Sequence, residues 1–398
     1  MATEVFLDIS RLTGRLLKGR LPTGVDRVDM AYIEHFADRA RAVIHLGGRP
    51  LLLSSNASRR IFKRLLNERE ILGAAIALDI VRGAIGGLGE PAPLGAVYLN
   101  TSHSGLLAPG LGLCLRLKGI QPIWMVHDLI PITHHEYCRP GEDDRHVRRM
   151  RSVLRHAAAL LTNSKATKEE LSEFAREAGL EVPPCVVARL APGLEAVEFG
   201  PPPLAKPYFV VISTIEPRKN LAMLLQVWRR LAQRHGQKTP SLVLVGQRAW
   251  ECENVIDLLE RSAPLHGLVI EKGRCSDKEL ATLLKHARAL LFPSFVEGYG
   301  LPLAEALDIG TPVIASDLQV FREIAGDVPD YLDPLDGPAW LRAVEQYTPP
   351  FSTQRTAQLN RIMGYMAPTW SQHFDVVDEL IRSRLATEEF GVISAKQA

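Results

Sequence analysis

The chain has 398 residues, of which 46% are hydrophobic and 23% are charged, and its formal net charge is +2. This length favours two or three domains, and the composition is typical of a globular protein with large buried cores. A nearly neutral chain gives no sign of a nucleic-acid partner. Its five cysteines form no C-x-x-C pair, which argues against a zinc site or a disulfide framework and fits a reducing cytoplasm.

The chain opens with an apolar run at residues 5–9 that predicts a first strand. No signal peptide is recognised, because residues 1–4 lack a basic region and Asp8 interrupts the apolar run. A loop containing Gly24 then leads into a helix that ends near Phe36. For any single residue of this loop, an ordinary helix start is an equally good interpretation.

Strand and helix patterns alternate through the first half of the chain. The stretch most like a membrane span, residues 71–89, contains Asp79, Arg82 and five glycines, so we expect a buried helix followed by a loop there. Further strands are predicted at residues 43–46, 96–99, 122–126 and 160–162, and further helices at 145–156 and 165–179. Such alternation predicts parallel sheets covered on both faces.

A histidine and an aspartate, His127 and Asp128, directly follow one predicted strand. A lone pair of this kind more often has a structural role than a catalytic one. His134 and His135 lie nearby, but their spacing matches no standard set of ligands. We therefore expect no metal site.

The helix at residues 145–155 is rich in arginine, whereas Met150, Val153 and Leu154 give its opposite side apolar character. Two interpretations stay open. The arginines contact an anionic membrane and bring the protein to a lipid-linked acceptor, or the helix packs on its domain and its arginines are solvated.

Residues 198–207, EFGPPPLAKP, interrupt the alternation, because three consecutive prolines continue neither a helix nor a sheet. The alternation then restarts. Strands are predicted at residues 208–213, 241–246 and 268–271, and helices at 220–235, 255–262 and 277–286. Two doubly wound domains joined near residue 200 are expected, with ligands at the carboxyl ends of the strands.

Two polar segments of the second half stand at strand ends. Residues 213–220, STIEPRKN, place Arg218 and Lys219 where they can reach a diphosphate, although basic residues at a helix start are often solvated. Residues 273–280, GRCSDKEL, contain Ser276 with Glu279 three positions later, which predicts a capping box at a helix start.

Residues 292–317, FPSFVEGYGLPLAEALDIGTPVIASD, predict a strand–loop–helix–strand unit. Glycines let the loop turn sharply and approach a ligand, and the start of the following helix favours an anion. Glu297 lies in the loop and Glu305 in the first helical turns. Two glutamates at this separation are unremarkable by themselves, and Glu305 near a helix start would also complement the helix dipole. Amide N–H groups suit a phosphate, and carboxylates suit sugar hydroxyls.

Together these segments resemble the donor-binding signature of retaining nucleotide-sugar glycosyltransferases of family 4, which share the GT-B fold. The similarity covers most of residues 120–385, and the first 120 residues match only in outline. It implies two Rossmann-like α/β domains that face a cleft. They would span residues 1–200, joined by a C-terminal helix at about 369–388, and residues 207–365. Trp370 would anchor that helix in the core.

The resemblance also implies roles for individual residues. Glu297 would face the donor sugar and Glu305 the ribose hydroxyls, Lys219 would pair with the departing diphosphate, and His127, oriented by Asp128, would approach the reaction centre. The further donor-binding candidates are Gly24, Ser213, Arg218, Arg274, Gly298, Tyr299, Gly300 and Leu301. Arg274 either reads a guanine carbonyl or is exposed.

The chain departs from the family pattern at Ser213 and Thr214, where many members have Gly-Arg and use that arginine on the phosphate. Either Arg218 or the two hydroxyls would replace it.

The function implied is transfer of a hexose, mannose from GDP-mannose above all, to a glycan or lipid-linked acceptor of bacterial polysaccharide assembly. No cofactor or metal is expected. UDP- or dTDP-sugar donors remain open, as do an inactive nucleotide-sugar-binding protein and a GT-B phosphorylase or epimerase.

Overall fold

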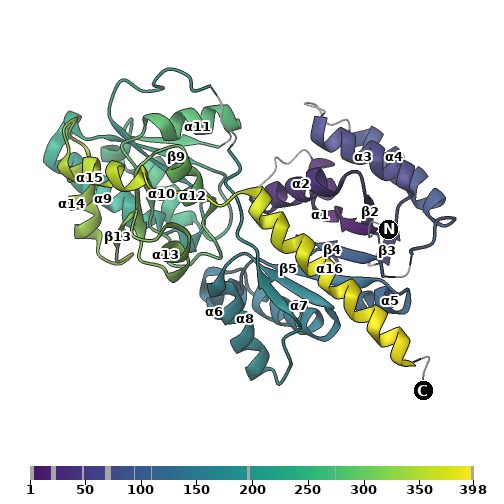
Figure 1. Cartoon of the computed structure of the whole chain (residues 1–398). Coiled ribbons are helices and arrows are strands. Elements are labelled where there is room, and N and C mark those ends of the chain that lie inside the picture. Colours follow the sequence, from purple (N-terminus) through teal and green to yellow (C-terminus); the bar gives the residue numbers. More distant parts are fainter. Residues whose placement is uncertain are drawn as a thin grey trace. The chain divides into compact units, whose positions relative to one another are not determined.

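The structure is a computed structural model that describes residues 4–18, 24–46, 49–67, 73–93, 95–108, 110–194, 198–273 and 275–395. The chain divides into two compact units, each built around its own β-sheet (Figure 1). The first unit comprises Met1–Ile132, Asp143–Leu190 and Trp370–Ala398, and the second comprises Thr133–Glu142 and Ala191–Thr369. The division falls after Leu190, somewhat before the predicted position near residue 200. Residues 133–142 belong with the second unit, which the sequence did not predict.

The first unit has a seven-stranded sheet in the order β3-β2-β1-β4-β5-β6-β7, parallel except for the edge strand β3. Its strands are β1 (Val5–Asp8), β2 (Ala40–Leu46), β3 (Arg49–Leu52), β4 (Val97–Asn100), β5 (Gln121–Val126), β6 (Ala159–Thr162) and β7 (Cys185–Val187). Its helices are α1 (Ser10–Leu16), α2 (Gly24–Phe36), α3 (Ser55–Asn67), α4 (Gly73–Gly87), α5 (Leu111–Leu117), α7 (Glu142–His156), α8 (Lys165–Glu177) and α16 (Trp370–Ala395). A short helix, α6 (Ile130–Thr133), leads to the 3-10 turn η1 (His135–Tyr137).

Helix α4 packs on the unit through the buried Ile76 and through small residues, and it turns several other large apolar residues outward. A Cβ on Gly83 would lie 2.7 Å from the Ala57 side chain of α3, and one on Gly87 would lie 2.0 Å from the Leu52 carbonyl oxygen. The exposed side carries Leu78, Val81, Ile85 and Leu88. The helix predicted within residues 71–89 is therefore present, but the expectation that it is buried was wrong along this side.

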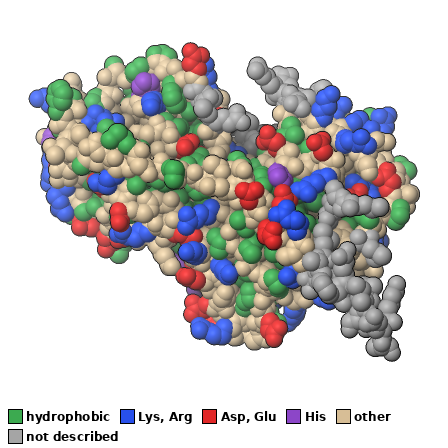
Figure 2. Space-filling model, in the orientation of Figure 1, with side chains coloured by type: hydrophobic (Ala, Val, Ile, Leu, Met, Phe, Trp, Pro, Cys, Tyr) green, Lys and Arg blue, Asp and Glu red, His purple; other side chains and the backbone are tan. Residues whose placement is uncertain are grey.

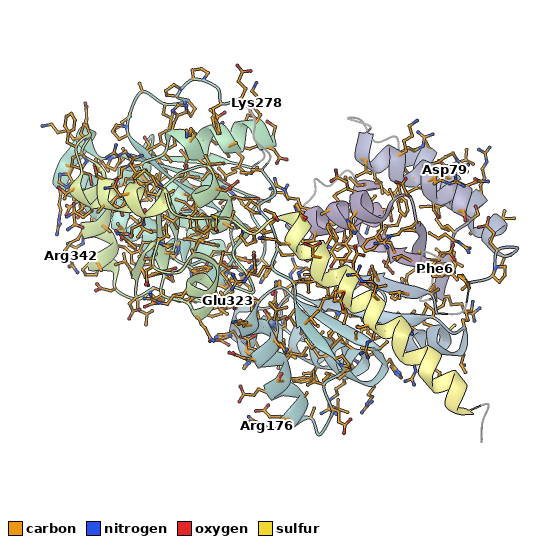
Figure 3. All side chains as sticks on the ribbon, viewed as in Figure 1. Phe6, Asp79, Arg176, Lys278, Glu323 and Arg342 are labelled. Atoms are coloured by element: carbon orange, nitrogen blue, oxygen red, sulfur yellow. The ribbon has the colours of Figure 1, made fainter. Side chains whose placement is uncertain are left out.

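Lys and Arg side chains gather over α3 and α4 (Figure 2). Asp79 of α4, labelled in Figure 3, is buried and pairs with Arg60 and Arg64 of α3 at 2.7 and 3.2 Å. Within the described residues, no helix is both long enough and apolar enough to cross a membrane.

Helix α16 returns the chain to the first unit. Trp370 stacks on Phe374 with ring centroids 5.8 Å apart, and Phe374 meets Tyr32 of α2 edge-on at 5.1 Å. The two ring nitrogens of His373 lie 3.0 Å from the Arg189 carbonyl oxygen and 2.9 Å from the Tyr32 hydroxyl. Aromatic packing and buried hydrogen bonds thus hold the start of α16 to the unit.

The second unit has a wholly parallel six-stranded sheet in the order β10-β9-β8-β11-β12-β13. Its strands are β8 (Tyr208–Ile212), β9 (Ser241–Val245), β10 (Val269–Lys272), β11 (Leu290–Phe292), β12 (Val313–Ser316) and β13 (Asp330–Leu332). Its α-helices are α9 (Leu221–His235), α10 (Glu253–Arg261), α11 (Asp277–His286), α12 (Leu301–Asp308), α13 (Gln319–Ala325), α14 (Gly337–Tyr347) and α15 (Thr353–Ile362). The 3-10 turns between residues 191 and 369 are η2 (Pro217–Lys219), η3 (Gly236–Lys238) and η4 (Ala263–Leu265).

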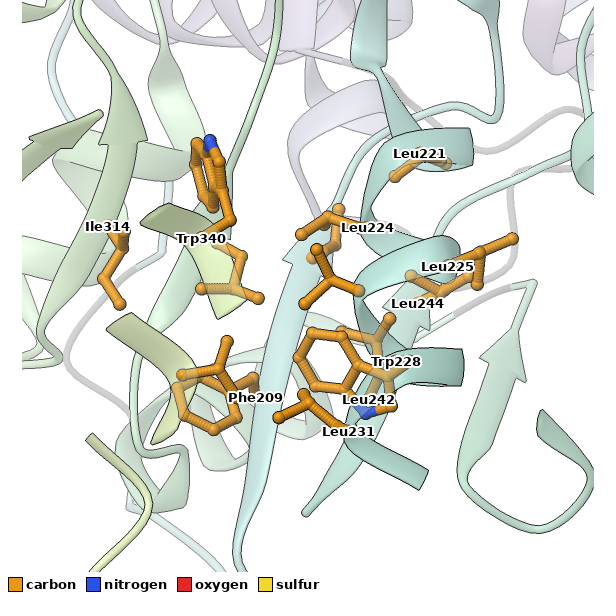
Figure 4. Close-up of a cluster of buried hydrophobic side chains, with 14 of the residues drawn as sticks. Phe209, Leu221, Leu224, Leu225, Trp228, Leu231, Leu242, Leu244, Ile314 and Trp340 are labelled. Carbon is orange, nitrogen blue, oxygen red and sulfur yellow. The ribbon is translucent and has the colours of Figure 1, made fainter. Parts of the chain in front are cut away.

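A cluster of fully buried side chains fixes β8 against α9 and α14 (Figure 4). Phe209 of β8 meets Trp228 of α9 edge-on, with ring centroids 5.9 Å apart. The indole nitrogens of Trp228 and Trp340 donate hydrogen bonds to backbone carbonyl oxygens, so neither buried N–H is left unpaired. This core holds the strand from which the loop of residues 213–220 departs.

Candidate active site

The candidate site begins at the point where the strand order of the second sheet reverses. Strands β8 and β11 are neighbours, and the chain continues to β9 on one side and to β12 on the other. In open α/β sheets, ligands bind beyond the carboxyl ends of the strands at such a switch point. The two loops that leave this point, residues 213–220 and 293–300, contain most of the predicted donor-site residues.

The two loops meet through a buried carboxylate. Glu297 accepts hydrogen bonds from Lys219 Nζ at 2.5 Å, from Arg218 Nη1 at 2.7 Å and from Ser294 Oγ at 2.7 Å. The Phe295 N–H donates to the Arg218 carbonyl oxygen at 2.9 Å and joins the loop backbones directly. The structure thus brings together three residues that the sequence nominated, and Ser294, which it did not.

Two further residues support the cations. Arg218 Nε lies 2.7 Å from Oε1 of the buried Glu216. Asn220 has a φ of 55°, and its side-chain amide donates to the carbonyl oxygens of Pro293 and Pro334. This left-handed residue ends the turn that carries Lys219 and precedes α9. Glu216 and Asn220 both lie in the string EPRKN. The sequence alone indicated only the basic pair of this string, because the roles of a carboxylate and an amide here depend on contacts that the sequence does not show.

The electrostatics of the cluster follow from burial and mutual charge. Burial alone would raise the pKa of Glu297, but the charges of Arg218 and Lys219, with hydrogen bonds from Lys219 and Ser294, lower it to about 2. Burial and the neighbouring Arg218 lower the pKa of Lys219, whereas Glu297 opposes that shift. The group therefore holds an ionised carboxylate between two cations at neutral pH.

The loop after β11 contains two glycines, and at one of them the backbone conformation and the surrounding side chains exclude any other residue. Gly300 has a φ of 125°, and a Cβ there would lie 2.8 Å from the Phe321 ring. Gly298 precedes the buried Tyr299, and Leu301 begins α12. This conformation sets the angle at which α12 leaves the loop.

Two other predicted donor-site residues, Glu305 and Ser213, also belong to the second unit. Glu305 on α12 is buried, and its carboxylate accepts the Gly193 N–H at 3.3 Å. The Ser213 hydroxyl is buried and has no hydrogen-bond partner within the described part of the chain. A Cβ on Gly246 would lie 1.8 Å from the Ser213 carbonyl oxygen, so glycine is required where the loop after β9 passes Ser213.

His127 lies in the first unit, directly after β5. Its Nε2 is 2.5 Å from the Thr101 carbonyl oxygen, and its own carbonyl oxygen accepts from Asn163 Nδ2 at 2.9 Å. Burial lowers the pKa of His127, against the Thr101 carbonyl and the charge of Asp128. The Asp128 carboxylate accepts the Ile130 N–H at 3.2 Å. We expected the Asp128 carboxylate to orient the His127 ring. In the structure, the Thr101 carbonyl oxygen makes the hydrogen-bond contact with the ring instead.

Gly24 lies outside this cluster. Gly24 is the exposed first residue of α2 in the first unit. Arg274 lies outside the described residues. Its neighbours Ser276 and Glu279 form the predicted capping box, with hydrogen bonds in both directions.

The arrangement in the second unit can receive an anion. Arg218 and Lys219 carry positive charge at the switch point, and their partner is a carboxylate from another loop. A phosphate oxygen that approaches these cations competes with Glu297 for the same donors. Binding of a phosphate would then free the carboxylate to accept hydrogen bonds from hydroxyl groups.

Solved structures share this architecture along nearly the whole chain. The sucrose-phosphate synthase from Thermosynechococcus elongatus matches with a TM-score of 0.66 at 17% identity, over 97% of this chain and 100% of that one. Anabaena HepE in complex with UDP and glucose matches with a TM-score of 0.64 at 16% identity, over 98% of this chain and 100% of that one. At these identities the likeness establishes the fold alone. The predicted fold class is confirmed, and the chain has the GT-B fold of two Rossmann-like units.

Sequence comparison then defines the family of the second unit. Residues 195–328 match the model of "Glycosyl transferases group 1". This stretch is a glycosyltransferase group 1 domain, and it contains the whole Lys219–Glu297 cluster.

Curated relatives carry related names. The O-antigen chain mannosyltransferase B of Escherichia coli is 38% identical over 129 residues, which are 32% of this chain and 33% of that protein. The serotype-specific mannosyltransferase WbdA of Escherichia coli is 27% identical over 288 residues, which are 66% of this chain and 34% of that protein. The chain thus matches about one third of the length of these two relatives.

Proposed function

We propose that the chain is a retaining glycosyltransferase of family 4 that transfers mannose from GDP-mannose to a glycan or lipid-linked acceptor in bacterial surface polysaccharide assembly. The observation that carries the proposal is the buried cluster of Arg218, Lys219 and Glu297 at the switch point of the second sheet. The mannosyltransferase names of the relatives support the choice of sugar.

In this proposal the donor diphosphate takes the place of Glu297 beside the two cations. Arg218 and Lys219 then stabilise the charge that develops as the bond between the anomeric carbon and the phosphate oxygen breaks. The acceptor oxygen forms its bond on the same face of the sugar and gives its proton to the departing phosphate. Glu297 accepts hydroxyls of the donor sugar, Glu305 holds the ribose, and His127 approaches the sugar near the reaction centre.

Nucleotide release from a panel of sugar donors tests the proposal. With an acceptor present, GDP-mannose should release GDP, whereas the other donors should release little nucleotide. Nuclear magnetic resonance of the product should show the anomeric configuration of the donor. An inverted product would contradict retention, and release from a UDP- or dTDP-sugar would replace the donor. Binding of nucleotide sugars without any release would favour an inactive binding protein.

We further propose that transfer needs no metal ion and takes place on the cytoplasmic side of the membrane. In this proposal the cations Arg218 and Lys219 supply the positive charge at the diphosphate. Activity should survive chelation. Loss of activity in EDTA that magnesium or manganese restores would contradict the metal-free mechanism.

A further inference from the structure

The outer side of α4 is an apolar stripe that lies on the surface of the first unit. Leu78, Val81, Ile85 and Leu88 recur at helical spacing and are 48%, 58%, 69% and 88% exposed. A helix that packs on a core normally turns its large apolar residues inward. Here Ile76 is turned inward and buried, but these four large apolar side chains face outward, so the stripe needs an explanation.

Glycines on one side of α4 explain why this side, and not the apolar stripe, faces the unit. Gly83 and Gly87 bring α4 against Ala57 of α3 and the backbone at Leu52, where no larger residue fits. A Cβ on Gly86 would lie 3.1 Å from the Ser54 side chain. Close contact of the backbones, together with the buried Ile76, thus holds the helix in place, and the four side chains of the stripe are left to contact something outside the unit.

Basic residues accompany the stripe. Arg82 stands on α4 beside Leu78 and Ile85, and Arg59 and Lys63 stand on the exposed side of α3. Figure 2 shows Lys and Arg side chains over these two helices. Within the described residues of α3 and α4 the one carboxylate is Asp79, which is buried and paired with Arg60 and Arg64. The exposed charge of the two helices is therefore positive.

We propose that the surface formed by α3 and α4 docks the protein on an anionic lipid bilayer. Apolar side chains on one helix face with basic residues beside them are the pattern of a helix that lies in the membrane interface. Helix α4 has 15 residues, whereas a span needs about 20, so the helix lies along the bilayer. The proposal does not depend on which sugar the protein transfers.

Helix α7 offers a weaker alternative. Its Met150, Val153 and Leu154 are buried in the core of the first unit, while Arg148 and Arg151 are exposed. The buried apolar side chains of α7 are not available for insertion into a membrane. The interpretation of α7 as a packed helix with solvated arginines therefore suffices, and insertion falls to α4.

Co-sedimentation of the whole chain with vesicles tests the proposal. The protein should bind vesicles of phosphatidylcholine with phosphatidylglycerol, and salt should weaken the binding. Val81→Asp plus Ile85→Asp should lower the partition coefficient about tenfold or more, because both side chains must leave the bilayer interface. Arg59→Glu plus Lys63→Glu should lower it and reduce the effect of salt.

Two double variants serve as matched controls. Phe351→Asp plus Met363→Asp alters two apolar residues of the second unit that are even more exposed than Val81 and Ile85, and Arg148→Glu plus Arg151→Glu alters the exposed charges of α7. Both should bind vesicles like the unaltered protein, and circular dichroism should show that every variant is folded. The chain already has five tryptophans, so a blue shift of the emission of Ile85→Trp on addition of vesicles would report insertion if it exceeds any shift of the unaltered protein.

Three outcomes would overturn the proposal. These are no binding to anionic vesicles at low salt, equal binding by the Val81→Asp plus Ile85→Asp variant, and a dimer in lipid-free solution that this variant dissociates. The last result would assign the stripe to a second copy of the chain. Nucleotide release is measured separately without vesicles, so failure of membrane docking and failure of the proposed transfer are distinguishable.

Discussion

Glu297 keeps its negative charge in a buried position because two cations and a hydroxyl surround it. Its side chain is 8% exposed, and the charges of Arg218 and Lys219 outweigh the effect of burial on its pKa. A buried carboxylate without such partners would be protonated at neutral pH. The same contacts make the cluster both a stabilising feature and a site that a phosphate can enter.

The free energy of unfolding should fall as the pH is lowered from about 4.5 towards 2. The pKa of Glu297 is about 2 in the folded chain against an ordinary 4.5, so its ionised form stabilises the fold above 4.5 and loses that effect as the pH falls through 2. Glu297→Gln should remove this part of the pH dependence in urea titrations. Glu181→Gln, at an exposed position, is the matched control. Identical slopes for Glu297→Gln and the unaltered protein would contradict the assignment.

Lys219→Ala should reduce kcat about 100-fold while changing the affinity for the donor less. In the proposed mechanism its charge stabilises the departing diphosphate more than the bound ground state. Steady-state kinetics with calorimetry of donor binding would separate the two effects. Lys278→Ala, on the exposed side of α11, should behave like the unaltered protein. A raised KM with an unchanged kcat would show that Lys219 only binds.

The two glutamates should differ in their effect on free nucleotide. Glu305→Ala should weaken nucleotide binding by about 1.5–3 kcal/mol, because the proposed charged hydrogen bond to the ribose would be lost. Glu297→Ala should spare or strengthen nucleotide binding, since Arg218 and Lys219 lose a competing partner, and should still reduce sugar transfer. Calorimetry on folded variants can decide. Equal losses for both variants would contradict the separate roles.

At the scale of elements, the site depends on the loop between β11 and α12. Gly300 combines a φ of 125° with close contact to the Phe321 ring, so both backbone conformation and space exclude a side chain. Leu301 and Pro302 then begin α12 and place Glu305 on its buried side. The loop conformation thus couples the position of Glu297 to that of Glu305.

Gly300→Ala should destabilise the fold by about 1–3 kcal/mol. The added Cβ would lie too close to the Phe321 ring, and the φ of 125° lies outside the range that alanine readily adopts. Urea unfolding would measure the loss. Gly273→Ala is the control, since a Cβ there meets no heavy atom within 4 Å and the backbone has no positive φ. Equal stability of the two variants would show that the loop adapts without cost.

At the scale of the whole molecule, residues 133–142 belong to the second unit, which the sequence did not predict. The chain on either side belongs to the first unit, but this segment packs on the second. Tyr137 stacks on Phe295 with centroids 5.4 Å apart, and Arg139 lies over the Trp250 ring at 5.2 Å. Phe295 is two residues from Glu297, so the segment touches the loop of the candidate site.

Tyr137→Ala should speed hydrogen exchange in residues 133–142 by up to about tenfold, because the stacked pair contributes about 0.5–1.5 kcal/mol. Exchange in residues 293–297 should rise as well if the stack supports the loop. Tyr137→Phe keeps the ring and should preserve slow exchange. Mass spectrometry of the peptides measures both segments, and unchanged exchange in Tyr137→Ala would show that the stack adds nothing.

Much of the molecule follows from its sequence because the signals are local. Period and composition gave most strands of both sheets to within a few residues, and the capping box at Ser276 was predicted from two residues alone. The alternation of strands and helices indicated two doubly wound units, and the order of strands in each agrees with that class. Arg218, Lys219 and Glu297 were nominated because their strings follow predicted strands and resemble the donor-binding signature of a glycosyltransferase family.

Only the tertiary structure decided which groups meet. Ser294 and Glu216 had no predicted role, because their use depends on contacts made across the fold. The outward stripe of α4 also escaped prediction, since periodicity marks an apolar face but does not say whether that face is inside. The glycines opposite the stripe lie so close to α3 and to the backbone at Leu52 that a side chain has no space there, so this face of α4 is the inner one. Local sequence thus determined the elements and their order, whereas long-range packing decided the contacts of each charge and the environment of each apolar face.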